Sequence, residues 1–173
     1  MKQLSSKEFS NLKHTQILAF NKEFKVAMSD SKQLEIAVLS NTTTNQFKDI
    51  FELRLRNEGI TPNIVFGDYD NILQDSIKYK EKDAVIIYWD LINVIEGFQY
   101  KVEIMKKNDL DKILEKVKRE ISLLFKTLST CPLVIFNKFN VSPFTYMTNE
   151  GFVSQKVAEE LNIFLESITP NNI

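Results

Sequence analysis

Hydroxyl and amide side chains follow directly on one short, mostly apolar run. The run Leu34–Leu39 is partly β-branched, which is typical of a buried strand, and it passes into Ser40, Asn41 and Thr42. Where a strand meets a helix, hydroxyl groups can act as a nucleophile or donate to an oxyanion, and α/β folds bind ligands there. The same residue types are preferred helix caps, so capping is the alternative. The glycines of a nucleophile elbow are missing around them.

An acidic pair, Asp68 and Asp70, follows the apolar run Ile64–Phe66. Such a pair after a strand is typical of phosphotransferases that use the first Asp as a nucleophile on Mg²⁺, and of sugar-nucleotide transferases that hold a metal with it. Here Gly67 separates the strand from the first Asp, and no later acidic pair follows a strand. The alternative is a turn and helix cap built from Asx side chains.

Two further strand ends carry polar side chains. Asp90 follows the apolar run Ala84–Trp89, and Asn137 follows the run Leu133–Phe136. A carboxylate at a strand end could orient a base or bind a hydroxyl group, and an amide could line the same edge. Both residue types also cap turns and helices, so the structural role stays open for each.

The sequence offers no evident general base. His14 is the single histidine, and it is predicted on the polar face of the first helix, far along the chain from any strand end. Cys131 is the single cysteine, which excludes an intramolecular disulfide and a multi-cysteine zinc site. It precedes Pro132 at the start of a strand, the wrong end for a site, so we predict a small buried side chain. We therefore expect no hydrolysis by this segment alone.

Helices are predicted between these strands. An N-terminal helix over 5–28 begins with a capping box of Ser5 and Glu8, although Gln16 interrupts its apolar stripe. Gly59 is expected to form a left-handed cap. The stretch Leu91–Lys107 is irregular. The other predicted helices are Phe47–Asn57, Ile72–Tyr79, Asp109–Leu128 and Ser154–Ser167.

The alternation of strands and helices implies parallel pairing through right-handed crossovers. The sequence thus predicts a three-layer, flavodoxin-like α/β fold, with a parallel sheet of at least four strands and helices on both faces. It forms one domain over 1–173, with its core in 34–168 and an extra N-terminal helix. One more strand would follow the last helix in this architecture, so we expect Ile173 to bound a fragment of a longer protein.

The bulk composition narrows the function classes. The chain has 173 residues, 43% hydrophobic and 26% charged, and its net charge is −1 from 22 basic and 23 acidic residues. This balance gives no electrostatic case for nucleic acid or an anionic membrane. No apolar run approaches the roughly 18 residues of a membrane span, and the N-terminus carries no signal-peptide core. A cytoplasmic location is the default expectation.

Four stretches together resemble a known family. They are I-A-V-L-S-N-T-T-T-N, N-E-G-I, N-I-V-F-G-D-Y-D-N and D-A-V-I-I-Y-W-D-L, in that order. They are similar to the N-terminal module of FkbH-like proteins, which are bacterial proteins of the HAD superfamily, subfamily IIIC. The resemblance covers Leu34 to Ile168, and its most specific parts are Gly67–Asp70 and Trp89–Leu91.

The resemblance implies an SGNH-hydrolase-like module that precedes a HAD domain in the full protein. That domain is similar to enzymes that move a glyceryl unit from a bisphosphorylated glycerate onto an acyl carrier protein, for polyketide or surface-glycan precursors. Mg²⁺ and the Asp-x-Asp nucleophile belong to that domain. Asp68 and Asp70 are therefore not the nucleophile pair, and no cofactor is implied for this segment.

The hydrolase motifs themselves are altered here. In SGNH hydrolases the first strand ends in G-D-S, whereas this chain has S-N-T, which puts Thr42 at the nucleophile and Asn41 at the Asp. Gly67 falls at the second-block glycine. In the third block, Asp90 replaces the glycine and Ile92 the asparagine. The block that holds the catalytic histidine would lie beyond residue 173. The resemblance thus implies a weak nucleophile and a missing oxyanion donor.

Our hypothesis is a non-catalytic accessory module that binds a small-molecule substrate or an acyl carrier protein beside its own C-terminal HAD domain. One alternative is a divergent ester or acyl-sugar hydrolase with Thr42 as nucleophile. Another is a stand-alone flavodoxin-like binding domain. In a response-regulator-like form Asp90 would accept a phosphoryl group, although Ser40 and Asn41 stand where acids are wanted. The predicted binding edge comprises Ser40, Asn41, Thr42, Gly67, Asp68, Asp90 and Asn137.

Overall fold

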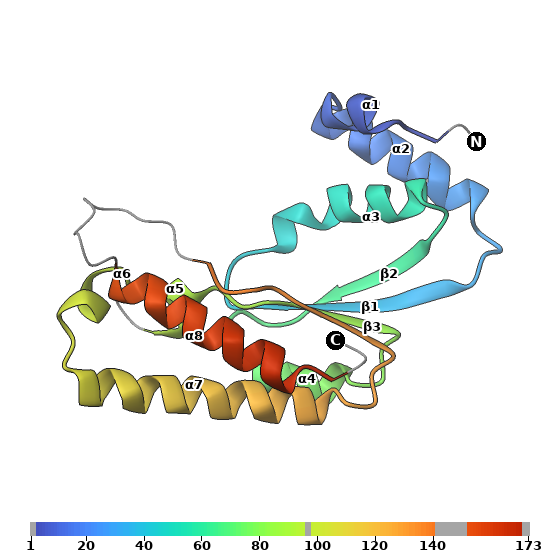
Figure 1. The fold of residues 1–173 in the computed structure, drawn as a ribbon. Helices are drawn as coiled ribbons and strands as arrows, with labels where there is room; N and C mark the ends of the chain where they lie inside the picture. The colour runs from blue at the N-terminus through green and yellow to red at the C-terminus, as the bar shows by residue number, and fades with distance from the viewer. Residues whose placement is uncertain (1–2, 96–97, 141–151, 171–173) are drawn as a thin grey trace.

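The computed structural model describes residues 3–95, 98–140 and 152–170 (Figure 1). Helices and strands alternate through most of it, as predicted. The elements are α1 (Ser6–Ser10), α2 (His14–Ala27), β1 (Gln33–Ser40), the 3-10 turn η1 (Asn45–Phe47), α3 (Lys48–Asn57), β2 (Thr61–Phe66), α4 (Ile72–Tyr79), β3 (Ala84–Tyr88), α5 (Leu91–Val94), α6 (Phe98–Lys101), the 3-10 turn η2 (Val102–Ile104), α7 (Lys107–Thr127), β4 (Leu133–Phe136) and α8 (Val153–Ile168).

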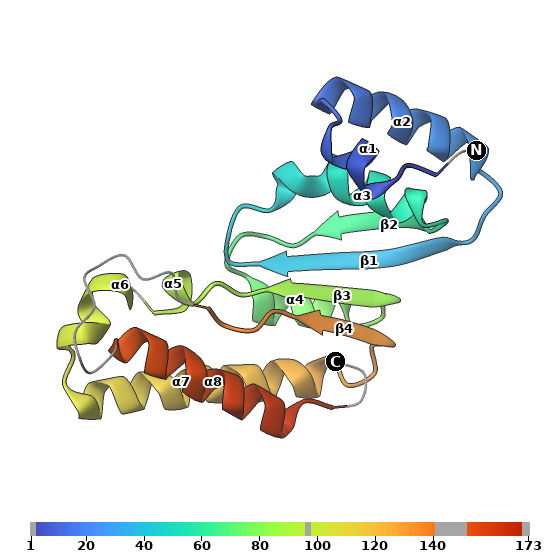
Figure 2. The same cartoon turned by 45° about the horizontal axis from the view of Figure 1, so that its top comes forward.

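The four strands form one parallel sheet in the order β2-β1-β3-β4 (Figure 2). Ile36 of β1 pairs with Ile64 of β2 on one side and with Ala84 of β3 on the other. The strand β3 is apolar throughout and lies inside the sheet, as its composition predicts. β2 lies at an edge and contains Pro62, whose missing N–H group is tolerated there.

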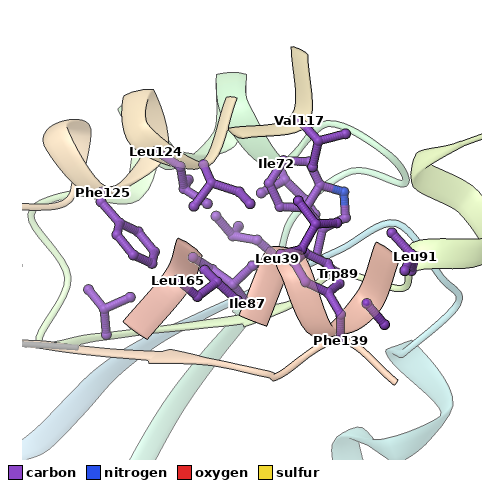
Figure 3. Packing of buried hydrophobic residues seen from close by; sticks show 14 of the residues in the cluster. Leu39, Ile72, Ile87, Trp89, Leu91, Val117, Leu124, Phe125, Phe139 and Leu165 are labelled. Atoms are coloured by element: carbon purple, nitrogen blue, oxygen red, sulfur yellow. The ribbon is translucent and has the colours of Figure 1, made fainter. Parts of the chain in front are cut away.

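One face of the sheet is covered by α4, α7 and α8 (Figure 1). The buried side chains of β1 and β3 on this face, such as Leu39 and Ile87, pack against Leu124 of α7 and Leu165 of α8 (Figure 3). Phe136 of β4 makes edge contacts with three aromatic rings of the same cluster at centroid distances of 5.6 to 6.2 Å. This face holds the main core of the protein.

The opposite face is covered by α3, which lies over the β1–β2 half of the sheet. Phe51 and Leu55 of α3 pack on Ile36 and Val38. The helix α2 then packs on the far side of α3, where its Ile17 and Phe24 cluster with Leu53 of α3. The three predicted layers are present, and the extra N-terminal segment adds an outer layer beyond α3.

The predicted single helix over 5–28 is wrong, because two helices occupy this segment. The capping box of Ser5 and Glu8 does begin the first of them. The chain leaves the helical path after Ser10, and α2 starts anew at His14. Gln16, which interrupts the apolar stripe, accepts a hydrogen bond from the backbone N–H of Lys13 at 2.8 Å, so it caps the second helix.

The segment Leu91–Lys107, irregular by sequence, forms two short helices and a 3-10 turn. Leu91, Ile95, Phe98 and Val102 are all nearly fully buried in the main core. Their spacing of four, three and four residues is the helical signal that sequence reasoning missed. The loop predicted over Asn140–Asn149 lies outside the described residues except for its first residue.

The N-terminus of α8 is held by a carboxylate from η2. Glu103 accepts hydrogen bonds from the backbone N–H groups of Val153 and Ser154 and from the Ser154 hydroxyl, at 2.8 to 3.0 Å. Desolvation alone would raise the pKa of Glu103, but these hydrogen bonds outweigh it and hold the pKa below 4.5. The carboxylate therefore acts as a cap supplied from 50 residues away in the chain.

This cap predicts a pH-dependent loss of stability. Because the pKa is lowered on folding, Glu103 stabilises the fold fully above its unfolded pKa, and this contribution is lost as the pH falls through the folded pKa. Glu103→Gln is expected to be less stable than the wild type at pH 7 by about 1 kcal/mol, and the difference should shrink below pH 4.5. Urea unfolding from pH 3 to pH 7 measures it. A constant difference across this range would contradict the role of the charge.

No helix in the described part of the chain is long and apolar enough to cross a membrane. Cys131 is 1% exposed, and burial raises the pKa of its thiol. It is the small buried side chain that its position predicts, and the raised pKa keeps it protonated rather than nucleophilic.

Candidate functional site

The carboxyl ends of the four strands meet at one edge of the sheet because all pairs are parallel. Ser40 ends β1, Gly67 follows β2, and Asn137 follows β4, while Asp90 comes two residues after β3. The residues of the predicted binding edge therefore lie at one edge of the sheet. The contacts among them decide which are available to a ligand.

Asn41 holds the ends of β1 and β3 together. Its side chain is fully buried, donates to the backbone carbonyl of Asp90 at 2.8 Å and accepts from the backbone N–H of Asp90 at 2.7 Å. The Asn93 amide donates to the backbone carbonyl of Asn41 at 3.0 Å. The Asn41 side chain therefore has a structural role, and both of its polar ends are occupied.

Ser40 and Thr42 form a local hydroxyl pair. The two hydroxyl oxygens lie 3.0 Å apart, and the Ser40 oxygen also accepts from the backbone N–H of Thr42 at 3.0 Å. This is the turn geometry that serine and threonine favour, so the local structural alternative describes Ser40 well. Thr42 is half-buried and lines two cavities that are described below.

The turn after β2 is held by a residue that sequence reasoning missed. Asp75 of α4 is 3% exposed, and its carboxylate accepts from the backbone N–H of Asp68 at 2.7 Å and from the Asn71 amide at 3.2 Å. A side chain at Gly67 would clash with it, since an added Cβ would lie 2.5 Å from the Asp75 Oδ2 atom. The side chains of Asp68 and Asp70 are exposed.

A sequence signal for Asp75 exists. Ile72, Asp75 and Ser76 share the buried face of α4 at helical spacing, so a carboxylate is predicted to point inward there. An inward carboxylate needs donors, and the tight turn at Gly67 supplies them. The turn that was expected to rest on the Asx side chains of Asp68 and Asp70 is thus held by the Asp75 carboxylate.

Asp90 and Asn137 both bind backbone groups. The Asp90 carboxylate accepts from the backbone N–H of Ile92 at 3.1 Å and caps α5. The Asn137 side chain accepts from the backbone N–H of Trp89 at 2.6 Å and donates to its carbonyl at 3.2 Å. Asn137 therefore ties β4 to β3 as Asn41 ties β1 to β3. Asp90 also lines the larger of the two cavities described below.

An apolar trough of about 650 Å³ opens between α3 and the sheet, next to this edge. Its apolar surface comes mainly from aromatic side chains, and its polar surface from Thr42, Thr44 and Asp90. Phe47 and Tyr88 are 53% and 46% exposed, which is high for large side chains of their kind. The lining residues are Val38, Thr42, Thr44, Phe47, Phe51, Phe66, Ile86, Tyr88 and Asp90.

A polar cavity of about 90 Å³ adjoins the trough. Thr42 and Thr44 line both cavities. The other residues that line the small one are Ser40, Thr43, Asn45, Gly67 and Tyr69. The two together resemble a site for a molecule with a small hydrogen-bonding head and a larger apolar part. The sequence did not single out trough residues such as Phe47 and Tyr88. Their exposure depends on where the helices lie over the sheet, which the sequence pattern does not give.

His14 does not join this edge. Its Nε2 atom lies 3.3 Å from the Asp49 carboxylate, on the side of α3 that faces α2. The histidine side chain is 67% exposed, as predicted. Thr42 lies on the sheet side of α3, with Phe47 and Phe51. The chain therefore brings no imidazole to the Thr42 hydroxyl.

Within the described ranges, no group of three or more His, Cys, Asp or Glu side chains could hold a metal ion. In particular, the exposed Asp68 and Asp70 are not joined by a third acidic ligand there. The residues described at this edge are suited to hydrogen bonding and apolar contact.

Comparison with known proteins gives one structural likeness. No protein-family model matches the sequence, and no curated protein does. The fold is similar to a crystal structure of the N-terminal part of the protein BF1531 from Bacteroides fragilis, which contains a phosphatase domain complexed with Mg. The TM-score is 0.67 over 88% of this chain, at 13% sequence identity, and the match spans 42% of the length of that chain. At this identity the likeness shows the fold alone.

Proposed function

We propose that this chain is a non-hydrolytic, SGNH-like accessory module of an FkbH-type HAD protein. It binds a small-molecule substrate or the acyl carrier protein at the carboxyl edge of the sheet, beside a C-terminal HAD domain. The observation that carries this proposal is that polar side chains at this edge of the sheet already have hydrogen-bond partners within the protein. Asn41 is locked between two strands, and Thr42 has a serine hydroxyl as its side-chain partner.

Hydrolysis needs more than this edge offers. A threonine nucleophile must lose its proton to a base within hydrogen-bond reach. The single histidine of the chain is paired with Asp49 on the other side of α3. Asp90 caps α5, and the fully buried Asn41 amide donates to the Asp90 carbonyl. Binding without bond cleavage suits these residues better.

The trough and the hydroxyl cavity support a binding role. An acyl or other apolar group fits the aromatic trough, and a hydroxylated head group suits the hydroxyls of Thr42 and Thr44 and the Asp90 carboxylate. A glyceryl or acyl unit on its carrier combines a hydroxylated part with an apolar part. This chemistry agrees with the transfer reaction that the family resemblance implies.

The structural likeness gives a second line of support. The similar chain contains a phosphatase domain with Mg, and this chain spans 42% of its length. We propose the corresponding arrangement here, with Mg²⁺ and the transfer chemistry in a HAD domain that follows this module in a longer form of the protein. No step of that chemistry is assigned to the residues described above.

The test compares the full-length natural open reading frame with the 173-residue chain. Both are assayed for release of a chromogenic acyl ester and for glyceryl loading of an acyl carrier protein with Mg²⁺. We expect the long form alone to load the carrier protein and neither form to cleave the ester. If the reading frame ends at residue 173, a stand-alone binding domain becomes the better account.

Ester cleavage decides against the hydrolase alternative. The wild-type 173-residue chain and the variants Thr42→Ala and Thr43→Ala are all expected to release the chromophore no faster than buffer, because the single histidine pairs with Asp49 away from Thr42. Stopped assays over a pH range of 6 to 9 measure this. Release by the wild type and by Thr43→Ala that Thr42→Ala abolishes would establish a divergent hydrolase instead.

A further inference from the structure

Among the described residues, no helix covers the β3–β4 half of one sheet face. On the side where α3 covers β1 and β2, Ile36 and Ile64 are 2% and 5% exposed. On the same side of β3 and β4, large apolar side chains lie open, and Tyr88, Leu133 and Ile135 are each 46 to 48% exposed. Strand register places them together, since Ile86 pairs with Ile135 and Ala84 with Leu133. We call Ile86, Tyr88, Leu133 and Ile135 the β3–β4 strip.

The strip continues around the free edge of β4. In the described chain β4 pairs with β3 alone. The backbone N–H of Asn137 donates to Ile87, so by the alternation of a parallel ladder Val134 and Phe136 direct their backbone groups to the free edge. A groove of about 520 Å³ runs along that edge, between β4 and the last turn of α8. Parallel sheets are normally covered on both faces, and open apolar edges invite further pairing.

The end of α8 leads into this groove. Thr169, just past the helix, lines it together with Leu165, Leu133 and Ile135. In the sheet, β3 lies next to β1, and β4 lies beyond β3 at the edge. The helices α7 and α8 both lie on the same face of the sheet. A right-handed crossover through α8 therefore delivers the following chain to the open side of β4, parallel to it.

We propose that polypeptide following residue 173, in a longer form of this protein, occupies this surface as one strand beside β4 and then one amphipathic helix over the β3–β4 strip. The inference rests on the longer protein proposed above. The helix would lie parallel to the sheet next to α3 and form the second wall of the apolar trough, because Ile86 and Tyr88 belong to both the strip and the trough. The binding site is then completed by a segment outside the 173 residues.

Cysteine labelling tests this proposal without any assay of activity. Ile135→Cys places a thiol on the strip, and Val26→Cys places a control thiol on α2, where the side chain is 71% exposed. The native Cys131 is 1% exposed and should react slowly. Both variants are made in the 173-residue chain and in the natural chain extended by about 40 residues, enough for a strand and a helix.

The extension is expected to slow labelling at position 135 by at least about tenfold, which corresponds to a local opening free energy of about 1.4 kcal/mol, and to leave position 26 unchanged. Hydrogen exchange on the unsubstituted chains should show added protection of the Val134 and Phe136 amides, which guards against an effect of the substitution. This outcome is independent of ligand binding and transfer activity, so the proposed function can fail while the proposal holds.

Three results would overturn the proposal. Equal labelling at position 135 in both chains, with unchanged amide exchange, means that the strip stays open. A reading frame that ends at residue 173 removes the occupant. Labelling at position 135 that slows with rising concentration of the 173-residue chain, together with dimers by sedimentation, assigns the strip to a second copy.

Discussion

Asn41→Ala is expected to lower the free energy of unfolding by about 2 kcal/mol. The Asn41 side chain is 0% exposed and satisfies both the N–H and the carbonyl of Asp90, at 2.7 and 2.8 Å. Alanine would leave the Asp90 N–H without its partner at a half-buried position, and one such group costs about 1 to 3 kcal/mol. The Asp90 carbonyl would keep the backbone N–H groups of Asn93 and Val94 as donors, at 3.1 and 3.2 Å. Urea denaturation of the 173-residue chain measures the change, as a lower midpoint with an unchanged slope.

Two neighbouring substitutions serve as controls. Thr43→Ala removes an exposed hydroxyl from the same turn and is expected to change stability by less than about 0.5 kcal/mol. Asn93→Ala removes a single hydrogen bond to the Asn41 carbonyl from an exposed side chain and should cost about 1 kcal/mol or less. If all three variants were equally stable, the proposed link between β1 and β3 through Asn41 would be wrong.

The sheet was predictable because its signals are local. Each strand is an apolar run followed by a polar turn, and β3, the most uniformly apolar one, lies inside the sheet as expected. The predicted helix Ile72–Tyr79 and strand Leu133–Phe136 agree with α4 and β4. The parallel order then follows from the alternation of strands and helices. These features need no knowledge of contacts between distant residues.

For the candidate site, the sequence predicted the edge of the sheet but not the contacts among its residues. Sequence reasoning brought Asn41 and Asp90 to one edge, but their pairing spans 49 residues and depends on how β1 and β3 are aligned. The same limit applies to Asp75, whose partner Asp68 belongs to the preceding turn. Polar residues at a strand end can bind a ligand or the backbone, and only the packed structure distinguishes the two. Here Asn41, Asn137 and Asp75 bind the backbone, whereas Thr42, Thr44 and Asp90 line the trough.

The break in the N-terminal helix shows a different limit. Gln16 is compatible with a continuous helix by its intrinsic propensity, so the stripe of apolar residues around it predicts one helix. In the structure its side chain caps a new helix, and this second start allows α2 to lie along α3. The competing interaction is a single hydrogen bond at a helix end, which a periodic pattern does not reveal.

Gly67→Ala is expected to destabilise the protein by about 3 kcal/mol. An alanine Cβ would lie 2.5 Å from the Asp75 Oδ2 atom and 2.9 Å from the Leu39 Cδ2 atom. Neither neighbour can move freely, since Asp75 holds the Asp68 N–H at 2.7 Å and Leu39 is 1% exposed in the main core. Thermal and urea unfolding measure the loss. Gly59→Ala is the matched control: its φ of 81° strains an alanine by about 1 to 2 kcal/mol, but nothing lies within 4 Å of its Cβ.

A double-mutant cycle separates the contact with Asp75 from a general intolerance of the turn. In an Asp75→Ala background the carboxylate is gone, so adding Gly67→Ala should cost less than in the wild type, by about 1 to 2 kcal/mol. The remaining cost reflects the approach to Leu39, 2.9 Å from the added carbon. Strict additivity of the two substitutions would mean that Asp75 does not restrict position 67. Alanine is therefore expected to lower stability more at Gly67 than at Gly59, although only Gly59 has a positive φ. The reason is that the buried Asp75 carboxylate fills the space beside Gly67.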